Sequence, residues 1–436
     1  MKVATTIEEQ FKIRMDEEQL LNCMRCGFCL PDCPTYIETQ DEAASPRGRI
    51  ALMKAVVDGV IEFDEDVERQ LNLCLGCRGC EPVCPSNVQY GHLLEEARDI
   101  INQNKKQANS TKILRNIVFD KLFPHQTRLK KATSLISIYQ RSGLQKVARK
   151  LGITKILPTQ LQSMEKILPE APTYKQMKNR PKYYPAIGET KKRVAFFTGC
   201  LMDSIFLKTN ESTLKLMQLA GCEIFIPDTQ NCCGALHGHS GEKALAKELA
   251  KRNIEAFEKL DVDAIVTNAG GCGAFLYEYD NLFKDDEEWL KRSQNFVKRL
   301  QDLSSLLIEL DFSNRDLSLP EQKVTYQDSC HLRNVMHVFD EPRRLIQSIN
   351  GVQYIEMQHA NRCCGSAGIY NIVEPEMSSQ ILDRKMQDVK DTEATTIVTS
   401  NPGCLLQMKL GVEKESLSHK IRVMHLADFL LEAVEN

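Results

Sequence analysis

The sequence predicts a multidomain protein in which an α-helical domain is followed by two α/β domains with parallel sheets. Three observations predict this fold class. Two matched groups of cysteines lie within residues 23–84, and the stretch between them has helical periodicity. The second half of the chain is a duplication, because matching segments recur at offsets of 130 to 132 residues. Within each copy, short β-rich runs alternate with helical patterns.

The two cysteine groups share the spacing C-x2-C-x2-C-x3-C-P. This spacing is typical of [4Fe–4S] clusters in proteins that hold two of them, where the fourth cysteine of each group ligates the other cluster. We therefore predict that the chain binds two [4Fe–4S] clusters. The predicted ligands are Cys23, Cys26, Cys29 and Cys84 for the first cluster, and Cys74, Cys77, Cys80 and Cys33 for the second.

Zinc binding or a disulfide framework is the alternative interpretation of these eight cysteines. A zinc site needs only four ligands, commonly supplied as pairs. Two quartets of equal spacing, each followed by a proline (Pro34 and Pro85), fit that arrangement poorly. The cluster interpretation is therefore preferred.

Helical signals surround the two quartets. Residues 1–22 have the pattern of an amphipathic helix, Ser45 is a candidate N-cap before Pro46, and residues 64–73 have the pattern of another helix. A helical insert between two such quartets resembles the α-helical ferredoxin domain of succinate dehydrogenase iron–sulfur subunits. This resemblance implies a helical ferredoxin domain at residues 1–105.

Residues 106–190 contain no cysteine and predict a helical linker. Helical patterns over 113–118 and 135–151 are separated by Pro124, and the prolines that follow predict that the linker wraps around its neighbours. Residues 105–193 contain 21 Lys and Arg against 4 Asp and Glu, although the net charge of the chain is −3. Such a segment suits an anionic partner, either another subunit or lipid headgroups at a membrane surface, or is a solvated basic surface. Nucleic acid is not expected, because no nucleic-acid-binding motif accompanies the basic residues.

The duplicated half predicts one α/β domain at residues 191–318 and a second at residues 319–436. Cysteines follow the expected strands, so they should meet at the carboxyl edge of each sheet, where such sheets bind ligands. The first copy is expected to have strands near 193–198, 223–226 and 264–267, and helices near 209–220 and 241–260. The candidate ligands of a further cluster or metal ion are Cys200, Cys232, Cys233 and Cys272 in the first copy, and Cys330, Cys363, Cys364 and Cys404 in the second.

The cysteine pattern of each copy resembles the CCG domain of heterodisulfide reductase, of the anaerobic glycerol-3-phosphate dehydrogenase C subunit and of glycolate oxidase. The fullest form of that pattern ends in C-x2-C, but Ala269 and Asn401 stand where the first cysteine of the pair would be. The missing sulfur argues against a non-cubane cluster of the heterodisulfide-reductase kind. A conventional cluster, a metal ion and redox-active thiols are all left open.

The sequence lacks the usual motifs for nucleotide cofactors and for serine hydrolases: there is no G-x-G-x-x-G after a strand, no P-loop and no G-x-S-x-G. We predict no catalytic residue and no flavin on this chain. Because iron–sulfur clusters move single electrons, a two-electron donor must be oxidised elsewhere, most simply by a flavoprotein partner.

Several absences bear on location. The N-terminus has no apolar signal core, no apolar run is long enough to span a bilayer, and the 17 cysteines suit a reducing compartment. The predicted location is cytoplasmic, with peripheral contact at the inner face of the membrane as an option.

The order of the parts resembles the iron–sulfur subunit of glycolate oxidase over essentially the whole chain, most closely at residues 199–203, 232–241 and 328–334. This resemblance implies a subunit of an oxidoreductase complex. Flavoprotein partners would oxidise glycolate to glyoxylate, and D-lactate to pyruvate, while this chain passes the electrons towards a quinone-type membrane acceptor. The alternatives are a heterodisulfide-reductase-like catalyst, the electron-transfer subunit of a glycerol-3-phosphate or D-lactate dehydrogenase, and a zinc-binding module without catalysis.

Overall fold

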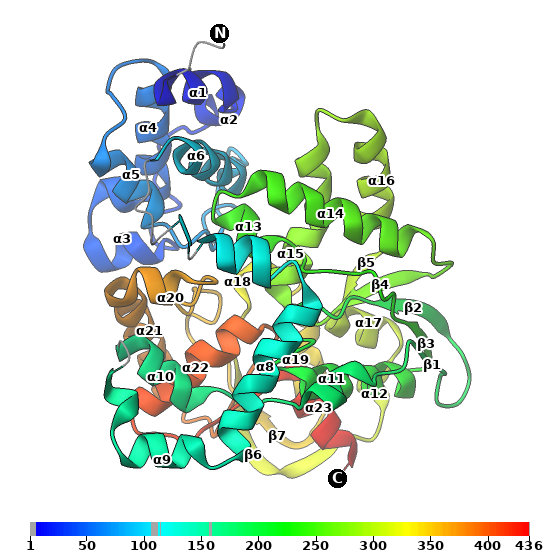
Figure 1. Ribbon diagram of the computed structural model, residues 1–436. Coiled ribbons are helices and arrows are strands. Elements are labelled where there is room, and N and C mark those ends of the chain that lie inside the picture. Colours follow the sequence, from blue (N-terminus) through cyan, green and yellow to red (C-terminus); the bar gives the residue numbers. More distant parts are fainter. Residues whose placement is uncertain (1–5, 106–111, 114, 157–158, 436) are drawn as a thin grey trace.

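The computed structural model describes residues 6–105, 112–113, 115–156 and 159–435. A helical N-terminal part packs against an α/β part, and the chain that joins them runs along the outside of the molecule (Figure 1). The predicted domain boundaries at residues 105, 190 and 318 stay predictions. The fold class agrees with the one predicted from the sequence.

The N-terminal part is helical, and a polar side chain caps the start of α1, α2, α4 and α5. Ser45 accepts a hydrogen bond from the Gly48 N–H, and Asp64 accepts one from the Val67 N–H, at 3.0 and 2.9 Å. Both predicted helix starts are therefore confirmed. The helices are α1 (Ile7–Arg14), α2 (Glu17–Leu21), α3 (Pro34–Thr39), α4 (Pro46–Val57), α5 (Glu65–Asn72) and α6 (Tyr90–Asn104).

The prediction of one continuous helix over residues 1–22 is wrong within the part that the structure describes. Met15 is extended, and the Asp16 side chain accepts a hydrogen bond from the Gln19 N–H at 3.1 Å, which begins a second helix. An aspartate in this position competes with the helical backbone for its N–H groups, so it ends α1 and starts α2. Residues 1–5 lie outside the described residues.

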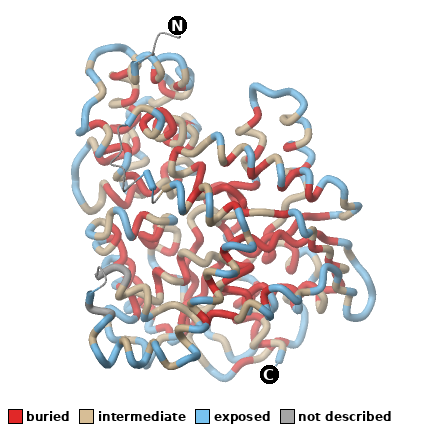
Figure 2. The backbone as a smooth tube through the Cα atoms, viewed as in Figure 1, coloured by how far each residue is buried: buried red, intermediate tan, exposed pale blue. Residues whose placement is uncertain are grey.

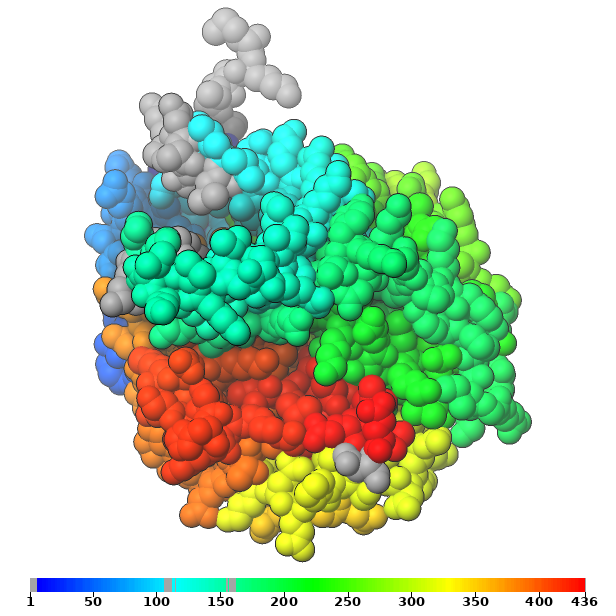
Figure 3. Space-filling view, turned by 60° about the horizontal axis from the view of Figure 1, so that its bottom comes forward, coloured from blue at the N-terminus to red at the C-terminus, as the bar shows by residue number. Residues whose placement is uncertain are grey.

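The linker contains more helix than its prolines suggested. A π-helical turn (Asn116–Leu122) precedes α8 (Gln126–Arg141) and α9 (Leu144–Lys150), and the pattern predicted over 135–151 is split because Gly143 adopts a φ of 82°. The proline-containing segment that follows contains α10 (Thr159–Ile167) and α11 (Tyr174–Lys178). Figure 3 shows the linker lying on the surface above the second repeat.

Each copy of the duplicated half forms a sheet, and the two sheets have matching strand orders. The first is ordered β1-β3-β2-β4-β5 and the second β7-β6-β8-β9, with every pair parallel except β1 and β3. The strands are β1 (Tyr183–Tyr184), β2 (Lys192–Phe196), β3 (Cys222–Phe225), β4 (Ala264–Thr267), β5 (Leu300–Asp302), β6 (Ser318–Tyr326), β7 (Asn350–Tyr354), β8 (Thr396–Thr399) and β9 (Arg422–His425). The antiparallel edge strand β1 comes from the linker and was not predicted.

Helices cover both sheets. Those of the first repeat are α12 (Leu207–Leu219), α13 (Ala235–His239), α14 (Lys243–Glu258), α15 (Gly270–Tyr277), α16 (Glu287–Val297) and α17 (Leu303–Glu309). Those of the second repeat are α18 (Cys330–Asn334), α19 (Asp340–Gln347), α20 (Tyr370–Val373), α21 (Pro375–Asp391), α22 (Pro402–Lys414) and α23 (Leu426–Glu435).

Helices of each repeat pack against helices of the other, and buried side chains of both repeats form one shared hydrophobic cluster. Helix α23 of the second repeat packs on α12 of the first, and α17 of the first packs on α19 of the second. Asp428 on α23 accepts hydrogen bonds from Thr209 and Ser212 on α12, both at 2.7 Å. Buried side chains of both repeats, including Phe196 and Phe429, form a single cluster. Figure 2 shows the buried residues of the α/β part in red, concentrated at its centre. The repeats therefore hold each other in a fixed relation.

This shared core predicts that the repeats unfold together. Phe429→Ala should destabilise the chain by about 3–5 kcal/mol, the usual cost of deleting a buried phenylalanine side chain. Trp289, the single tryptophan of the sequence, lies on α16 in the other repeat. In guanidinium unfolding followed by Trp289 fluorescence, Phe429→Ala should lower the midpoint, whereas Val373→Ala, at a side chain that is 62% exposed, should not. An unchanged midpoint for Phe429→Ala would mean that the repeats unfold independently.

Candidate metal centres

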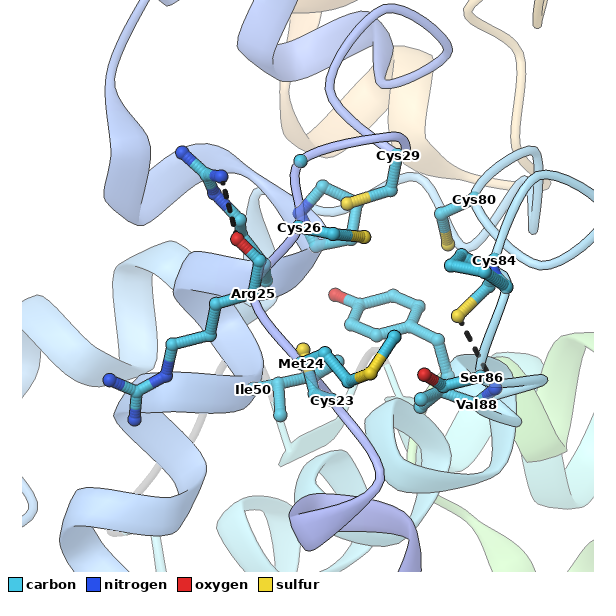
Figure 4. A pocket seen from close by; sticks show the side chains of 15 residues that line it. Cys23, Met24, Arg25, Cys26, Cys29, Ile50, Cys80, Cys84, Ser86 and Val88 are labelled. Atoms are coloured by element: carbon cyan, nitrogen blue, oxygen red, sulfur yellow. Dashed lines mark hydrogen bonds between the residues drawn. The ribbon is translucent and has the colours of Figure 1, made fainter.

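The first cysteine quartet lies around a small pocket in the N-terminal part (Figure 4). Cys84, from the loop before α6, faces the loop between α2 and α3 across this pocket, which Cys80 and the ring of Tyr90 also line. The loop between α2 and α3 contributes Cys23, Cys26 and Cys29. Cys26 is exposed. The structure thus brings together the four cysteines predicted for the first cluster, at a place open to solvent.

The bend of this loop depends on Gly27. Its φ is 92°, and a Cβ there would lie 2.8 Å from Nη1 of Arg47. That guanidinium donates a hydrogen bond to the Arg25 carbonyl oxygen at 3.0 Å. Arg47 therefore connects α4 to the cysteine loop, and its guanidinium occupies the space that a side chain at position 27 would need.

The second quartet is more deeply buried than the first. Cys33, Cys74 and Cys80 are buried and Cys77 is half-buried. Burial raises the pKa of the Cys80 thiol well above its usual value, and the nearby Glu81, Cys77, Cys74 and Cys33 add to this effect. The four cysteines predicted for the second cluster are therefore close enough to repel one another when ionised, as expected of ligands that need a cation among them.

Arg49 on α4 lies beside this quartet, and the sequence reasoning missed it. Its side chain is fully buried and donates hydrogen bonds to the Gln70 carbonyl oxygen and the Thr35 hydroxyl, at 2.7 and 3.0 Å, while Nη1 has no partner. Burial opposes ionisation of the Cys74 thiol, but the charges of Arg49 and Arg98 outweigh burial and lower its pKa. A buried cation with an unused donor suits an anionic group held by these sulfurs. One feature of the sequence could have indicated this residue: Arg49 lies four residues before Met53, on a helix face that is otherwise apolar.

The cysteines of the first repeat meet at the carboxyl edge of its sheet. Cys200 follows β2, the adjacent pair Cys232 and Cys233 follows β3, and Cys272 lies in the first turn of α15 after β4. The thiol of Cys232 contacts those of Cys200 and Cys233, and the thiol of Cys233 contacts that of Cys272. The backbone N–H of Gly234 donates to the Cys232 sulfur at 3.5 Å.

The second repeat repeats this arrangement. Cys330 begins α18, and the thiols of Cys363 and Cys364 contact Cys330 and Cys404, respectively. The Gly365 N–H donates to the Cys363 sulfur at 3.5 Å. Both sets of four cysteines predicted from the sequence are therefore gathered, one set in each repeat.

The second quartet and the second repeat lie against each other. Burial raises the pKa of the Cys77 thiol well above its usual value, and the nearby Cys330 thiol adds the next largest effect. Leu75 packs with Cys363 and Tyr370 in one buried cluster. The Tyr370 hydroxyl donates to the Leu73 carbonyl oxygen at 2.8 Å. No sequence pattern indicated this contact, which joins residues almost three hundred positions apart.

The two positions that depart from the fullest CCG pattern lie at the contact between the repeats. The Gly271 N–H donates to Oδ1 of Asn401 at 3.0 Å, and Nδ2 of Asn401 donates to the Cys404 sulfur at 3.5 Å. Ala269 is buried, and the adjacent Gly270 N–H donates to the Ser400 carbonyl oxygen at 3.0 Å. The Asn401 side chain thus donates a hydrogen bond to Cys404 and, by accepting one from Gly271, connects the two repeats.

Ion pairs connect the N-terminal part to the first repeat. Arg78 pairs with Glu278, and Nε2 of His92 lies 3.1 Å from the same carboxylate. Burial opposes ionisation of Glu278, but the hydrogen bond with His92 and the charge of Arg78 outweigh it and lower the pKa of Glu278 to about 2. The contact holds the second quartet in place relative to the repeats.

Within the described ranges, no three Cys, His, Asp or Glu side chains converge closely enough to hold a single metal ion. A cubane cluster is larger than one ion, so its four thiolate ligands surround it at wider spacing. The donor set of the two quartets, all thiols with buried cations beside the deeper one, fits such a cluster.

Comparison with known proteins shows the family. A 4Fe-4S dicluster domain model matches residues 19–88, a cysteine-rich domain model matches residues 194–277 and 324–409, and a model of the linker region of the glycolate oxidase iron–sulfur subunit matches residues 110–168. The chain is 66% identical over 429 residues to the probable glycolate oxidase iron–sulfur subunit of Bacillus subtilis (strain 168), covering 98% of this chain and 97% of that one. The chain belongs to the family of glycolate oxidase iron–sulfur subunits. This confirms the resemblance seen in the sequence, and as a family member the chain is an iron–sulfur component of an oxidoreductase complex.

More distant relatives extend the comparison. The glycolate oxidase iron–sulfur subunit of Escherichia coli (strain K12) is 29% identical over 412 residues, covering 93% of each chain. Lactate utilization protein A of an Exiguobacterium species is 30% identical over 243 residues, covering 56% of this chain and 98% of that protein. A crystal structure of a hypothetical protein from Helicobacter pylori superposes with a TM-score of 0.54 at 10% identity, over 99% of this chain and 73% of that one. At this low identity, the superposition shows a similar fold and nothing further.

The position of Arg49 predicts an effect on an iron–sulfur potential. Reduction adds negative charge, so Arg49→Met should lower the midpoint potential of one centre by on the order of 100 mV, from a unit charge about 6–10 Å away at an effective dielectric of about 20. Arg49→Lys keeps the charge and should shift the potential much less. Potentiometric titration followed by electron paramagnetic resonance measures both, and equal shifts for the two variants would show that the charge of Arg49 is not responsible.

Proposed function

We propose that this chain is the electron-transfer subunit of a glycolate-oxidising complex and that its two quartets hold two [4Fe–4S] clusters. Such clusters supply one-electron steps. The observation that supports this most is the line of sulfur groups that runs from the first quartet, where Cys26 is exposed, through the more deeply buried second quartet, to the cysteines of the second repeat.

The proposed ligand sets are those that the spacing predicts, listed by cluster: Cys23, Cys26, Cys29 and Cys84, then Cys74, Cys77, Cys80 and Cys33. The surrounding residues exclude water and set the local charge. Arg49 brings a buried positive charge to the second set, and backbone N–H groups of Gly76 and Val88 donate to the sulfurs of Cys74 and Cys84 at 3.4 and 3.5 Å. Such hydrogen bonds and charges adjust the potential of an iron–sulfur centre.

We further propose that the four cysteines of the second repeat hold an additional cluster, which continues the line. The contact of Cys77 with Cys330 and Cys363 supports this, because a redox group there would lie directly against the second quartet. The equivalent group of the first repeat is the alternative position. A zinc ion or free thiols in either repeat are the competing occupants, and iron, sulfide and zinc analysis separates them.

The electrons are proposed to come from a flavoprotein partner that oxidises glycolate, because this chain has no flavin motif. Two exposed apolar side chains flank Cys26 beside the first quartet, Met24 at 67% and Phe28 at 63% exposure. Apolar residues of this kind beside a solvent-open redox group suit a docking face for the electron donor. The similarity to lactate utilization protein A makes lactate the second substrate to test.

Cluster-ligand variants test this function in the reconstituted complex. Cys26→Ser and Cys77→Ser should each lower the iron content by up to about four atoms per chain, since each disrupts a different cubane. Glycolate-dependent reduction of an acceptor that the flavoprotein alone does not reduce should fall to the level without this subunit.

Cys222→Ala is the matched control. Cys222 is buried in β3 within the hydrophobic core and belongs to neither quartet nor either repeat group. It should keep full iron content and activity. Undiminished acceptor reduction by Cys26→Ser together with Cys77→Ser would overturn the proposed function.

The location is proposed to be cytoplasmic, with peripheral contact between the linker and the membrane. Within the described residues, no helix has both the length and the apolar character needed to cross a bilayer. Helices α8 and α9 carry Leu135, Leu144 and Val147 at 68%, 56% and 52% exposure, next to exposed Lys146 and Lys150. Apolar side chains interleaved with lysines suit an interface with anionic lipid.

Vesicle binding tests the membrane contact. Lys146→Gln with Lys150→Gln should weaken binding to vesicles containing phosphatidylglycerol by about 30-fold, at about 1 kcal/mol for each lysine. The control pair Lys291→Gln with Lys298→Gln removes the same charge from α16 and the residue that follows it, and should bind like the unaltered chain. Cosedimentation measures both, and equal weakening by the two pairs would show that this face is not the contact; a partner subunit would then be its occupant.

A further inference from the structure

Lys385, on α21 of the second repeat, is a buried cation without a paired carboxylate. The residue is 2% exposed, and its Nζ donates a hydrogen bond to the His359 carbonyl oxygen. Within the described ranges Lys385 takes part in no ion pair; the carboxylate of Asp388 lies 3.1 Å from Nδ1 of His359 instead. An ammonium group has three N–H donors, and the hydrogen bonds of the described residues use one of them.

Helix α21 turns the face that carries Lys385 towards the adjacent cysteines. Ser378, Ile381 and Lys385 follow each other at spacings of three and four residues, so they lie on one side of the helix. The Ser378 hydroxyl donates to the Gly365 carbonyl oxygen at 2.8 Å, directly after the cysteine pair. Ile381 packs with Cys363 in one buried cluster. The ammonium group of Lys385 is therefore held beside the cysteines of the second repeat.

The charge of Lys385 is costly to bury in this place. Burial lowers the pKa of Lys385 to about 8, while nearby Asp388 and the Cys364 and Cys363 thiols oppose this effect. A second carboxylate that acts on Lys385, that of Asp328, is already paired with two arginines. A buried charge is stabilised by a neighbour of opposite sign. The cysteines can supply it, because a thiol is neutral but becomes a negative thiolate when it ligates a metal centre.

The duplication offers an internal comparison for this position. The glycines of the two Cys-Cys-Gly segments both have a φ of 90°. A Cβ at Gly234 would lie 3.5 Å from the Ala246 carbonyl oxygen, and a Cβ at Gly365 would lie 2.8 Å from the Ser378 carbonyl oxygen. Ala246 on α14 and Ser378 on α21 therefore occupy equivalent places, 132 residues apart. Buried apolar residues of the two helices match at the same offset: Leu249 with Ile381, and Ile254 with Met386.

At this offset the counterpart of Lys385 in the first repeat is Asn253, a neutral residue. Asn253 is fully buried, and its Nδ2 donates to the Cys232 carbonyl oxygen and the Tyr279 hydroxyl, both at 3.0 Å. Its Oδ1 accepts from the Asn231 N–H at 2.8 Å. The amide thus has partners on both ends within the first repeat. The second repeat has a cation with unused donors at the same place, so the two cysteine groups differ in the charge beside them.

We propose that Lys385 is the counter-charge of an anionic iron–sulfur cluster on the four cysteines of the second repeat, and that this charge makes the second repeat, not the first, the one that holds a cluster. This inference rests on the proposed function, which leaves the choice between the repeats open. Four thiolate ligands carry more negative charge than a cubane core neutralises, and reduction adds one more. A buried ammonium group favours the cluster over its absence and the reduced form over the oxidised one.

Lys385→Met and Lys385→Gln test this in the full-length chain, purified anaerobically with its clusters. Both variants should lower the midpoint potential of one centre, and should release up to about four iron atoms per chain to a ferrous chelator roughly tenfold faster. Potentiometric titration followed by electron paramagnetic resonance measures the potential. Lys390→Met is the matched control on the same helix, because the Lys390 side chain is 38% exposed and pairs with Glu415, and it should change neither quantity.

The two substitutions separate charge from hydrogen bonding. Glutamine keeps a donor for the His359 carbonyl oxygen but has no charge, so both variants should shift the potential alike. Recovery of the original potential by Lys385→Gln would show that Lys385 acts only through that hydrogen bond and would overturn the inference. Unchanged potentials and iron release in both variants would also overturn it.

Ligand variants decide which repeat is occupied. Cys364→Ser should lose the signal of the centre that Lys385→Met shifts, whereas Cys233→Ser should keep all of its iron. Retention of all iron by Cys364→Ser, or iron loss by Cys233→Ser, would overturn the inference and leave the two quartets and the proposed function intact. These measurements are made on the chain without its electron donor, so a failure of glycolate-dependent activity in the complex would overturn the proposed function separately.

Discussion

The packing of the Cys74–Cys80 loop against the second repeat is the contact on which the proposed electron path depends. Leu75 and Tyr370 exclude water between the two sulfur groups, and the Tyr370 hydroxyl fixes the loop through a backbone carbonyl. Without this contact the two cysteine quartets of the N-terminal part would be isolated from the repeats. With it, the helical N-terminal part and the two sheets, which are distant in sequence, together hold a row of thiols.

The two repeats form a rigid unit because they pack tightly against each other. The helices at their interface bury side chains of both repeats in one cluster, and Asp428 accepts two hydrogen bonds across the same interface. The turns that carry Cys272 and Cys404 are joined by the Gly271–Asn401 hydrogen bond. A duplicated fold thus places its two cysteine groups at a fixed separation, which a redox relay needs more than it needs any catalytic side chain.

Charge is arranged along the same path. Arg49 places a positive group within a sulfur-rich interior, where the negative charge of a reduced centre would otherwise be costly. The basic linker lies on the surface above the second repeat, so the electrostatic attraction of an anionic partner would act on that side of the molecule.

The sequence by itself determined the two quartets, the duplication, the parallel sheets and the position of every cysteine near a strand end. These features follow from local spacing and periodicity, which short-range physical chemistry imposes: cysteines two residues apart can wrap a cluster, and apolar runs between helices form buried strands. Even the helix start at Ser45 could be predicted, because a capping side chain acts within one turn. Only the tertiary structure decided that Cys77 and Cys330 pack together, that Arg49 is buried beside Cys74, and that the linker forms α10 and packs it against α22. Those outcomes depend on contacts between residues tens to hundreds of positions apart, which leave no periodic signal in a single chain.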